Sequence, residues 1–406
     1  MSLMPRPMMH PDVARDRLLD GVAPLASETV PLGACRGRVL AAPLLARLTQ
    51  PPFPASAMDG WAIRFDDLPG PFRIIGTASA GHGFAGRLGP GQTVRIFTGA
   101  VLPQGADTVM VQEEVVATET DALLTGEGPP RVGAHVRPRG QDFAEGAELM
   151  VAGTRLSARH IGLAAAAGHA AATVWRRPRV TLVATGDELV PPGQMPGPGQ
   201  IISGNALMLA ALLEGCGAEV RDLGILPDRR AVIADAIGAA AAETDLLITI
   251  GGASVGDHDL IVPALSDLGA SLDFWKIALR PGKPLIAGRL GTTRVLGLPG
   301  NPVSAYVCAL LFAGPLVRQM GGLDPAIPVF EKPLAGALPA TGPRRDHLRA
   351  RLLADGRVEP YALQESAHLA RLAGADVLIV RDAGAPPAAA GEMVRCLALD
   401  MFRDVA

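Results

Sequence analysis

The chain has 406 residues, of which 49% are hydrophobic and 19% are charged, and its formal net charge is −3 at pH 7. This length and composition predict a globular protein of roughly two to four domains and exclude a disordered chain. The small negative charge gives no general attraction to nucleic acid or to an anionic membrane surface, so we expect neither as a partner.

Cysteine usage and the distribution of apolar residues predict the compartment. The four cysteines are far apart and form no CxxC pair, which indicates reduced, mostly buried thiols rather than a zinc or iron–sulfur site. The N-terminus lacks the apolar run of a signal peptide, and charged or small residues interrupt every longer apolar stretch. We therefore expect a cytoplasmic protein that does not cross a membrane.

The first part of the chain, up to about residue 176, has a β-rich character. Glycine and proline separate short apolar runs at 72–75, 93–97 and 108–111. Helices are expected only at 13–19 and 158–168. This region therefore predicts β-rich modules with long loops.

From residue 179 to about 320, predicted strands alternate with predicted helices. The strands are 180–184, 219–226, 246–250, 284–287 and 294–298. The helices are 205–214, with Asn205 as its cap, 230–242 and 302–320. This alternation predicts a doubly wound parallel sheet that binds its ligand at the carboxyl ends of the strands, and the text after residue 327 predicts a small C-terminal β domain.

A glycine-rich turn with two carboxylates follows the buried strand at 246–250. Gly251, Gly252 and Gly256 allow close approach of backbone N–H groups to a ligand, whereas Asp257 and Asp259 repel anions unless a hard cation lies between. This combination indicates a magnesium-dependent site for a phosphorylated ligand. A tight turn with solvated acids is the alternative.

Further polar clusters follow the neighbouring strands. Glu188 and Asp228 come after the first two strands of this region, and a later loop contains Lys276, Arg280 and Lys283. A doubly wound sheet would bring these acids and bases to one edge, as a cation site facing an anion site. Helix capping by the acids and solvation of the basic loop are the alternatives.

The segment 51–62 is rich in proline and contains the turn Asp59-Gly60. A plain turn is one interpretation. The residues 97–100 and 140–142 form similar short polar loops, to which the residues alone assign no role.

Six of these segments, in this order, resemble the MoeA-type molybdopterin molybdotransferases, a family that includes the gephyrin E domain. They are residues 56–62, 98–99, 185–189, 251–259, 280–284 and 297–304. The resemblance covers essentially the whole chain and implies Mg²⁺-dependent insertion of molybdate into adenylylated molybdopterin with release of AMP. It also implies a homodimer whose active site combines two subunits, and partners that include a molybdopterin adenylyltransferase and recipient molybdoenzymes.

The resemblance implies four domains and a set of functional residues. The domains are 1–50 with 140–176 (N-terminal linking domain), 51–139 (inserted β-rich domain), 177–326 (α/β, molybdopterin-binding) and 327–406 (C-terminal β domain). The implied catalytic residues are Glu188, Asp228, Asp259, Asp59, Asp142 and Thr98. The implied substrate- and anion-binding residues are Gly251, Gly252, Ser254, Gly256, Lys276, Arg280, Lys283, Ser304, Arg344 and Ser366. The implied metal ligands are Asp228, Asp257, Asp259 and Glu188.

Departures from the family pattern leave other functions open. Arg280 replaces a usual lysine, and residues 364–371 lack the family's Gly-Ser-Gly and introduce Glu365 beside Ser366. One alternative is therefore a catalytically weak paralogue that acts as a molybdopterin-binding chaperone or scaffold. Another is adenylylation of molybdopterin, against which the additional N- and C-terminal modules argue.

Overall fold

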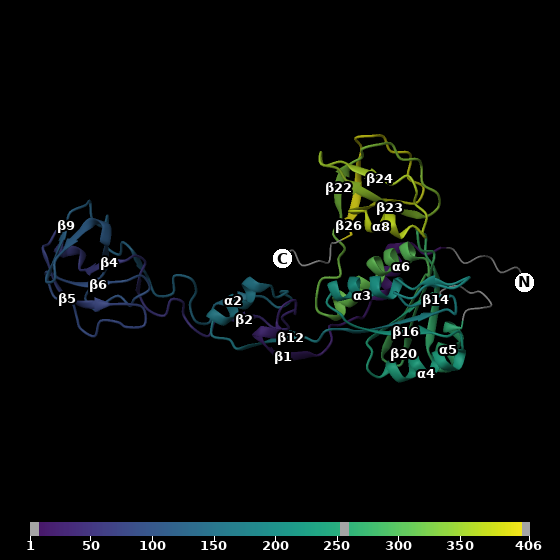
Figure 1. Cartoon of the computed structure of the whole chain (residues 1–406), viewed down its shortest axis with the longest axis horizontal. Coiled ribbons are helices and arrows are strands. Elements are labelled where there is room, and N and C mark those ends of the chain that lie inside the picture. Colours follow the sequence, from purple (N-terminus) through teal and green to yellow (C-terminus); the bar gives the residue numbers. More distant parts are fainter. Residues whose placement is uncertain (1–7, 252–259, 400–406) are drawn as a thin grey trace, which may run out of the picture.

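The computed structural model describes residues 8–251 and 260–399. The chain is elongated: a β-rich module lies at one end, a small linking module follows, and the α/β region lies with the C-terminal β domain at the other end (Figure 1).

The distal module is built on a six-stranded sheet in the order β7-β4-β6-β5-β9-β8. Its strands are β4 (Gly60–Ile63), β5 (Phe72–Ala78), β6 (Gln92–Ile96), β7 (Thr108–Val111), β8 (Val115–Ala117) and β9 (Asp121–Leu124). Successive residues of β4 enter different cores, because Ala62 packs with Val94 and Val109 while Trp61 and Ile63 pack elsewhere. Both faces of this sheet are therefore covered, and its strand ends remain for polar residues.

The linking module combines residues from both sides of the distal module. Strand β1 (Ser27–Pro31) pairs antiparallel with β12 (Ala171–Trp175), and β2 (Leu44–Leu45) pairs with β11 (Glu148–Met150). Helix α2 (Ala158–Ala166) and the short helix Leu32–Ala34 complete it, with Leu40, Met150 and Val174 in the core. Strands β3 (Ala55–Ser56) and β10 (Val136–Arg137) pair where the chain enters and leaves the distal module.

The α/β region contains a six-stranded sheet in the order β16-β13-β17-β21-β20-β18. Its strands are β13 (Arg179–Thr185), β16 (Glu219–Leu226), β17 (Leu246–Ile250), β18 (Ser271–Lys276), β20 (Pro284–Leu290) and β21 (Thr293–Leu298). The first four strands in this order are parallel, but β20 runs antiparallel to both of its neighbours. The predicted all-parallel sheet is therefore wrong: β20 and β21 are joined by the short turn at Gly291, which can connect only antiparallel strands. Strand β18 was not predicted.

Helices cover both faces of this sheet. Helices α4 (Arg230–Ala241) and α5 (Ile261–Asp267) pack on the face that carries Val183 and Leu247. The opposite face, with Val180 and Leu182, is covered by α1 (Pro11–Leu19), α3 (Asn205–Gly215), α6 (Pro302–Cys308) and α7 (Gly314–Met320). Helix α1 lies within the segment 1–50 of the predicted linking domain, yet its Ala14 and Leu18 are buried here, in the α/β core.

The predicted closing helix over 302–320 consists of α6, a π-helical turn (Ala309–Ala313) and α7. Among the residues that the structure describes, this is the one helix long and apolar enough to cross a membrane, but 83% of it is buried inside the protein. That burial is what a core helix shows.

The C-terminal domain is a β domain, as predicted. Its sheet runs β19-β23-β25-β26-β22, with β24 paired to β23. The strands are β19 (Leu279–Arg280), β22 (Phe330–Pro333), β23 (Arg345–Leu352), β24 (Val358–Pro360), β25 (Val377–Arg381) and β26 (Met393–Ala398). Strand β19 comes from the α/β region, so the basic loop around Arg280 is part of both units.

Candidate functional site

The acids after the first two strands of the α/β region lie together. The backbone N–H of Asp187 donates to Asp228 Oδ2 at 3.3 Å, and the N–H of Asp228 donates to Asp187 Oδ1 at 3.2 Å. These residues follow β13 and β16, which are neighbours in the sheet. Glu188, the next residue after Asp187, is exposed on the same loop. The loops that carry Glu188 and Asp228 thus lie together at one sheet edge, and the residue that directly contacts Asp228 is Asp187.

The position of Glu188 depends on the glycine two residues before it. Gly186 has φ +146°, and a Cβ at this position would collide with the carboxylate of Glu188. The carboxylate folds back over the space that a side chain at 186 would occupy. The positive φ therefore favours glycine here, and any larger residue would also displace the Glu188 carboxylate from this position.

The end of the third strand lies next to the end of β21. Gly251 has φ +87°, and its N–H donates to the carbonyl of Leu298 at 3.0 Å. Asn205 Nδ2 donates to the carbonyl of Gly300 at 2.6 Å and so ties α3 to the same turn. Asn205 was expected to cap α3, and this prediction is wrong. Gly204 occupies the cap position, and Asn205 is the first helical residue.

The predicted metal ligands are only partly described. Gly252, Ser254, Gly256, Asp257 and Asp259 lie outside the described residues. Within residues 8–251 and 260–399, no group of three or more His, Cys, Asp or Glu is arranged to hold a metal ion. Glu188 and Asp228 supply two exposed carboxylates, which are ligands of the hard oxygen type that Mg²⁺ prefers.

The basic loop packs against α6 and exposes its charges. The N–H of Ile277 donates to the carbonyl of Lys283 at 2.9 Å, so the loop closes on itself between Lys276 and Lys283. Gly282 has φ +106°, and a Cβ there would lie 2.5 Å from Cys308 Sγ on α6. The backbone thus lies directly on α6, while the side chains of Lys276 and Lys283 are exposed.

Arg280 has a carboxylate neighbour. Its guanidinium lies 3.8 Å from Asp346 on β23. Burial raises the pKa of Asp346, although Arg280 beside it acts in the opposite sense. The side chain of Arg280 is 56% exposed, so this long ion pair leaves the guanidinium accessible to an anion.

The C-terminal domain reaches the same place through residue 366. The N–H of Val303 at the start of α6 donates to the carbonyl of Ser366 at 3.1 Å. Ser304, the next residue, is buried, and Arg344 Nη1 lies 3.5 Å from the carbonyl of Leu279. The structure therefore brings Ser304, Arg344 and Ser366 to the boundary of the α/β region and the C-terminal domain, near Arg280.

A cavity of about 790 Å³ opens at this boundary. Arg280, Asp346, Tyr361, Glu365 and Arg381 are among the residues that line it. Glu365, the acid that departs from the family pattern, forms an ion pair of 3.2 Å with His368 when the histidine is protonated. An acidic side chain therefore lines the same cavity as Arg280.

The remaining predicted residues lie far from this boundary. In the distal module, Asp59 Oδ1 accepts hydrogen bonds from the backbone N–H and from Oγ1 of Thr98, both at 2.8 Å. These bonds lower the pKa of the Asp59 carboxyl. Asp142 is exposed in the linking module, where its N–H donates to the carbonyl of Gln50 at 3.0 Å. Because the linking module separates the distal module from the α/β region, one chain does not bring Asp59 and Glu188 together (Figure 1).

The sequence interpretation missed Arg95 in the distal module. Its guanidinium lies 5.2 Å from the ring centroid of Trp61 and 5.0 Å from that of Phe97, the residue before Thr98. The signal was present as a cation two residues before an aromatic in a predicted strand, since such residues share a face.

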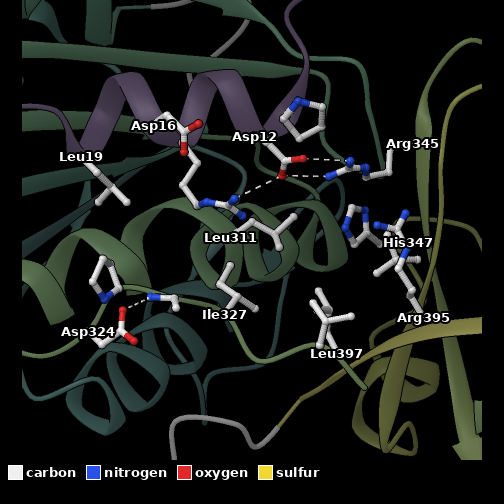
Figure 2. A pocket seen from close by; sticks show the side chains of 16 residues that line it. Asp12, Asp16, Leu19, Leu311, Asp324, Ile327, Arg345, His347, Arg395 and Leu397 are labelled. Carbon is white, nitrogen blue, oxygen red and sulfur yellow. Dashed lines mark hydrogen bonds and ion pairs between the residues drawn. The ribbon is translucent and has the colours of Figure 1, made fainter. Parts of the chain in front are cut away.

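A second cavity, of about 490 Å³, lies between α1, the segment 324–329 and the C-terminal domain (Figure 2). Asp12 and Arg345 form a two-bond ion pair across it, with both distances 2.9 Å. Burial opposes ionisation of Asp12, but this ion pair outweighs it and lowers the pKa of that carboxyl. Beside the pair, burial lowers the pKa of His347 to about 3. None of the predicted site residues lines this cavity. Because Asp12 lies on α1 and Arg345 on β23, their ion pair joins α1 to the C-terminal domain.

The fold and these residues define a class: a multidomain protein in which an α/β domain with polar loops at one sheet edge lies between β-rich modules. Three family profiles match in succession: the MoeA N-terminal region (domain I and II) over residues 9–168, a probable molybdopterin binding domain over 181–319, and the MoeA C-terminal region (domain IV) over 332–399. The chain belongs to the MoeA family.

Relatives of known name support the same assignment. Proteins named molybdopterin molybdenumtransferase are 36% identical in Nostoc sp. (92% of this chain, 89% of the relative) and 32% identical in Bacillus subtilis (91% and 89%). A MoeA crystal structure from Pyrococcus horikoshii has a TM-score of 0.83 and 28% identity, covering 97% of this chain and 99% of that one. The predicted family is confirmed, as is the prediction that the chain is a transferase, and the relatives support a role in molybdenum cofactor biosynthesis.

Proposed function

We propose that this protein inserts molybdate into adenylylated molybdopterin in a Mg²⁺-dependent reaction that releases AMP. The observation that carries the proposal is that two kinds of residue lie along the same edge of one sheet: carboxylates on the loops after β13 and β16, and exposed bases on the loop 276–283, which follows β18. An adenylylated pterin with an oxyanion substrate needs both kinds of residue. The carboxylates would hold the Mg²⁺ that offsets the charge of the phosphoanhydride, and the bases would bind the tetrahedral oxyanion directly.

The acids have the role of a cation site. Glu188 and Asp228 are exposed, and neither makes an ion pair with a residue that the structure describes. They are oxygen donors whose charge is not neutralised by a nearby base, which fits Mg²⁺. When bound, Mg²⁺ offsets the phosphoanhydride charge and stabilises the departing AMP. Asp257 and Asp259 are proposed to complete the ligand set, with Gly251, Gly252, Ser254 and Gly256 as the phosphate cradle.

The bases have the role of an oxyanion site. Lys276, Arg280 and Lys283 would hold molybdate by charge-assisted hydrogen bonds, each with a strength on the order of 1.5–3 kcal/mol. Ser304, Arg344 and Ser366 lie at the same boundary and are proposed to bind the pterin phosphate. Holding both substrates on one rigid edge lowers the entropic cost of bringing them together.

Asp59 and Thr98 of the distal module and Asp142 of the linking module are proposed to contribute to the active site of the partner subunit in a homodimer. The distal and linking modules, which carry these three residues, lie apart from the α/β region that carries Glu188 (Figure 1). The proposal therefore assigns each active site an α/β half from one subunit and an Asp59–Thr98 half from the other. The proposed location is the cytoplasm, with a molybdopterin adenylyltransferase supplying the substrate and molybdoenzymes receiving the product.

One observation favours a second candidate, a molybdopterin-binding chaperone or scaffold. Glu365 lines the cavity that contains Arg280, and a carboxylate there opposes oxyanion binding. A protein with this role would bind pterin tightly but turn it over slowly. Adenylylation of molybdopterin, the other alternative, would instead consume ATP.

The test is AMP release from purified protein and adenylylated molybdopterin, with Mg²⁺ and molybdate each added or withheld. The proposed function requires AMP only when both are present, with no consumption of ATP. Tight pterin binding without AMP release would support the chaperone, and ATP consumption would support the adenylyltransferase.

A further inference from the structure

We propose that Arg95 is the positioning residue of the Asp59–Thr98 pair, acting through its neighbours rather than by touching a substrate. This inference rests on the proposed function, in which that pair works in the active site of the partner subunit. Its structural basis is a set of contacts that join the two turns carrying Asp59 and Thr98.

Asp59 and Thr98 sit on different turns, which must be held in register. Asp59 immediately precedes β4, and Thr98 is the second residue after the end of β6. The strands pair antiparallel with Trp61 directly opposite Arg95. Because cross-strand partners project from the same face, the guanidinium of Arg95 lies beside the indole of Trp61.

The guanidinium lies between two aromatic rings. One ring belongs to Trp61, two residues after Asp59, and the other belongs to Phe97, one residue before Thr98. Both centroids are close to 5 Å from Arg95 Cζ, at 5.2 and 5.0 Å. A single planar cation thus contacts one residue close in sequence to each partner of the pair.

Two hydrogen bonds fix the orientation of the same guanidinium. Arg95 Nη1 donates to the carbonyl of Gly60 at 3.1 Å, and Nη2 donates to Gln112 Oε1 at 2.6 Å. The backbone N–H of Gln112 in turn donates to the carbonyl of Asp59 at 3.0 Å. Arg95 therefore holds the turn at Asp59 from two sides.

Close packing explains why this arrangement tolerates little displacement. A Cβ at position 60 would overlap the carbonyl oxygen of Met110, so Gly60 lets β4 and β7 approach closely. Trp61 is only 8% exposed, whereas Phe97 is 37% exposed. The inner ring is fixed by the core, and Arg95 transmits that fixed position outward to Phe97 and Thr98.

Lysine cannot replace this function. It keeps the charge but lacks the planar fork that donates to Gly60 and Gln112 while stacking on two rings. The variant Arg95→Lys therefore separates geometry from charge. Arg73→Ala is the matched control, because Arg73 is an exposed arginine on β5 of the same sheet.

The experiment measures the carboxyl pKa of Asp59 by carbon-13 NMR and the kcat and KM for AMP release in the homodimer. In Arg95→Lys we expect the pKa of Asp59 to rise and kcat to fall by about 10- to 100-fold with little change in the KM for pterin. We expect Arg95→Ala to show the same changes and to be partly rescued by added guanidinium ion. The Arg73→Ala variant should match the wild type in every measurement.

The outcomes separate the inference from the function on which it rests. An unchanged Asp59 pKa and unchanged kcat in Arg95→Lys would overturn the role of Arg95, whatever the wild type does. In Arg95→Ala, a fall in kcat that is accompanied by a lower melting temperature and is not reversed by guanidinium ion would also overturn it. Loss of a merely structural residue gives that result. Absence of AMP release from the wild type would refute the proposed function, while the pKa comparison would still test the positioning of Asp59.

Discussion

The two groups of site residues differ in how far the structure prepares them before any ligand binds. In the distal module, Asp59 already accepts two hydrogen bonds from Thr98, and Arg95 stacks against the residues on either side. At the edge of the α/β sheet, Glu188 and Asp228 are exposed. The Asp228 carboxylate accepts a long hydrogen bond of 3.3 Å from the backbone N–H of Asp187. The distal half is pre-organised and the α/β half is open.

This difference indicates a division of labour. A pre-formed carboxylate with a lowered pKa is suited to act without rearrangement. Exposed carboxylates with no neutralising partner are suited to take up a cation and a charged substrate. Substitutions in the α/β half should therefore affect cation and substrate use, and substitutions in the distal half should affect the orientation of an already ionised acid.

The largest expected effect is that of Glu188→Ala. Loss of this carboxylate should lower AMP release by on the order of 10²- to 10³-fold, because a proposed ligand of the catalytic Mg²⁺ is removed. The measurement is the rate of AMP release at saturating Mg²⁺. The control is Glu214→Ala, an exposed acid on α3, which should leave the rate unchanged. Equal rates for the two variants would contradict the proposed role of Glu188.

The next effect is a loss of folding stability at acid pH, which must be distinguished from a loss of catalytic activity at acid pH. The pKa of His347 is about 3 in the folded protein, against 6.5 for an ordinary histidine, because the ring is buried. Between these pH values the unfolded chain binds a proton that the folded chain does not. The free energy of unfolding is therefore highest above pH 6.5 and decreases as the pH falls, by about 2 kcal/mol from pH 6.5 to pH 5.

The measurement is amide hydrogen exchange of β23 at pH 6.5 and pH 5, corrected for intrinsic exchange rates. His347→Leu should remove most of the pH-dependent loss, and His82→Leu, a change at an exposed histidine, should not. If the wild-type amides are equally protected at both pH values, His347 takes up its proton in the folded protein as readily as in the unfolded chain. Such protection would also assign any acid loss of activity to the site itself.

Thr98→Ala tests the pre-organised half. It removes one of the two hydrogen bonds to Asp59 Oδ1, so the pKa of that carboxyl should rise and the acid limb of the rate profile should move to higher pH. The rate should fall by up to about tenfold, the value of one hydrogen bond. Thr98→Ser should retain activity, and Thr118→Ala on another turn of the module is the control. An unchanged pH profile would show that Asp59 does not depend on Thr98.

The smallest expected effect is that of Glu365→Gly. Removing this carboxylate from the cavity that contains Arg280 should lower the KM for molybdate by about threefold, because the side chain is largely exposed and its charge is screened. Glu359→Gly is unsuitable as a control because Glu359 lines the same cavity, so Glu331→Gln on β22 is used instead. A raised KM would mean that Glu365 assists binding.

Much of the α/β region was predictable because periodicity and turn residues act locally. The strands at 219–226 and 246–250 have the predicted limits as β16 and β17. A strand was predicted at 284–287, but its antiparallel direction as β20 was missed, since pairing direction depends on connections that a run of apolar residues does not encode. The edge strand β18 was not predicted. The expected cap at Asn205 failed because its side chain is engaged by the carbonyl of Gly300, a contact distant in sequence.

The candidate site was predictable to a similar degree. The approach of Glu188 and Asp228 followed from strand order, and the pairing of Asp59 with Thr98 came only through the family resemblance. The contacts of Arg95 were not predicted, because a guanidinium between two rings requires the cross-strand register of β4 and β6. Packing of α1 on the α/β region was missed as well, since Ala14 and Leu18 are far in sequence from the core residues with which they pack.

The most direct measurement is subunit complementation. Asp59→Asn and Glu188→Ala proteins, each nearly inactive alone, are unfolded together, refolded as mixed dimers and tested for AMP release. If each site combines Glu188 from one subunit with Asp59 from the other, random pairing leaves one intact site in half of the dimers, and roughly one quarter of the wild-type activity returns. Activity no greater than that of the two separate variants, in dimers shown to be mixed, would contradict a site shared between subunits.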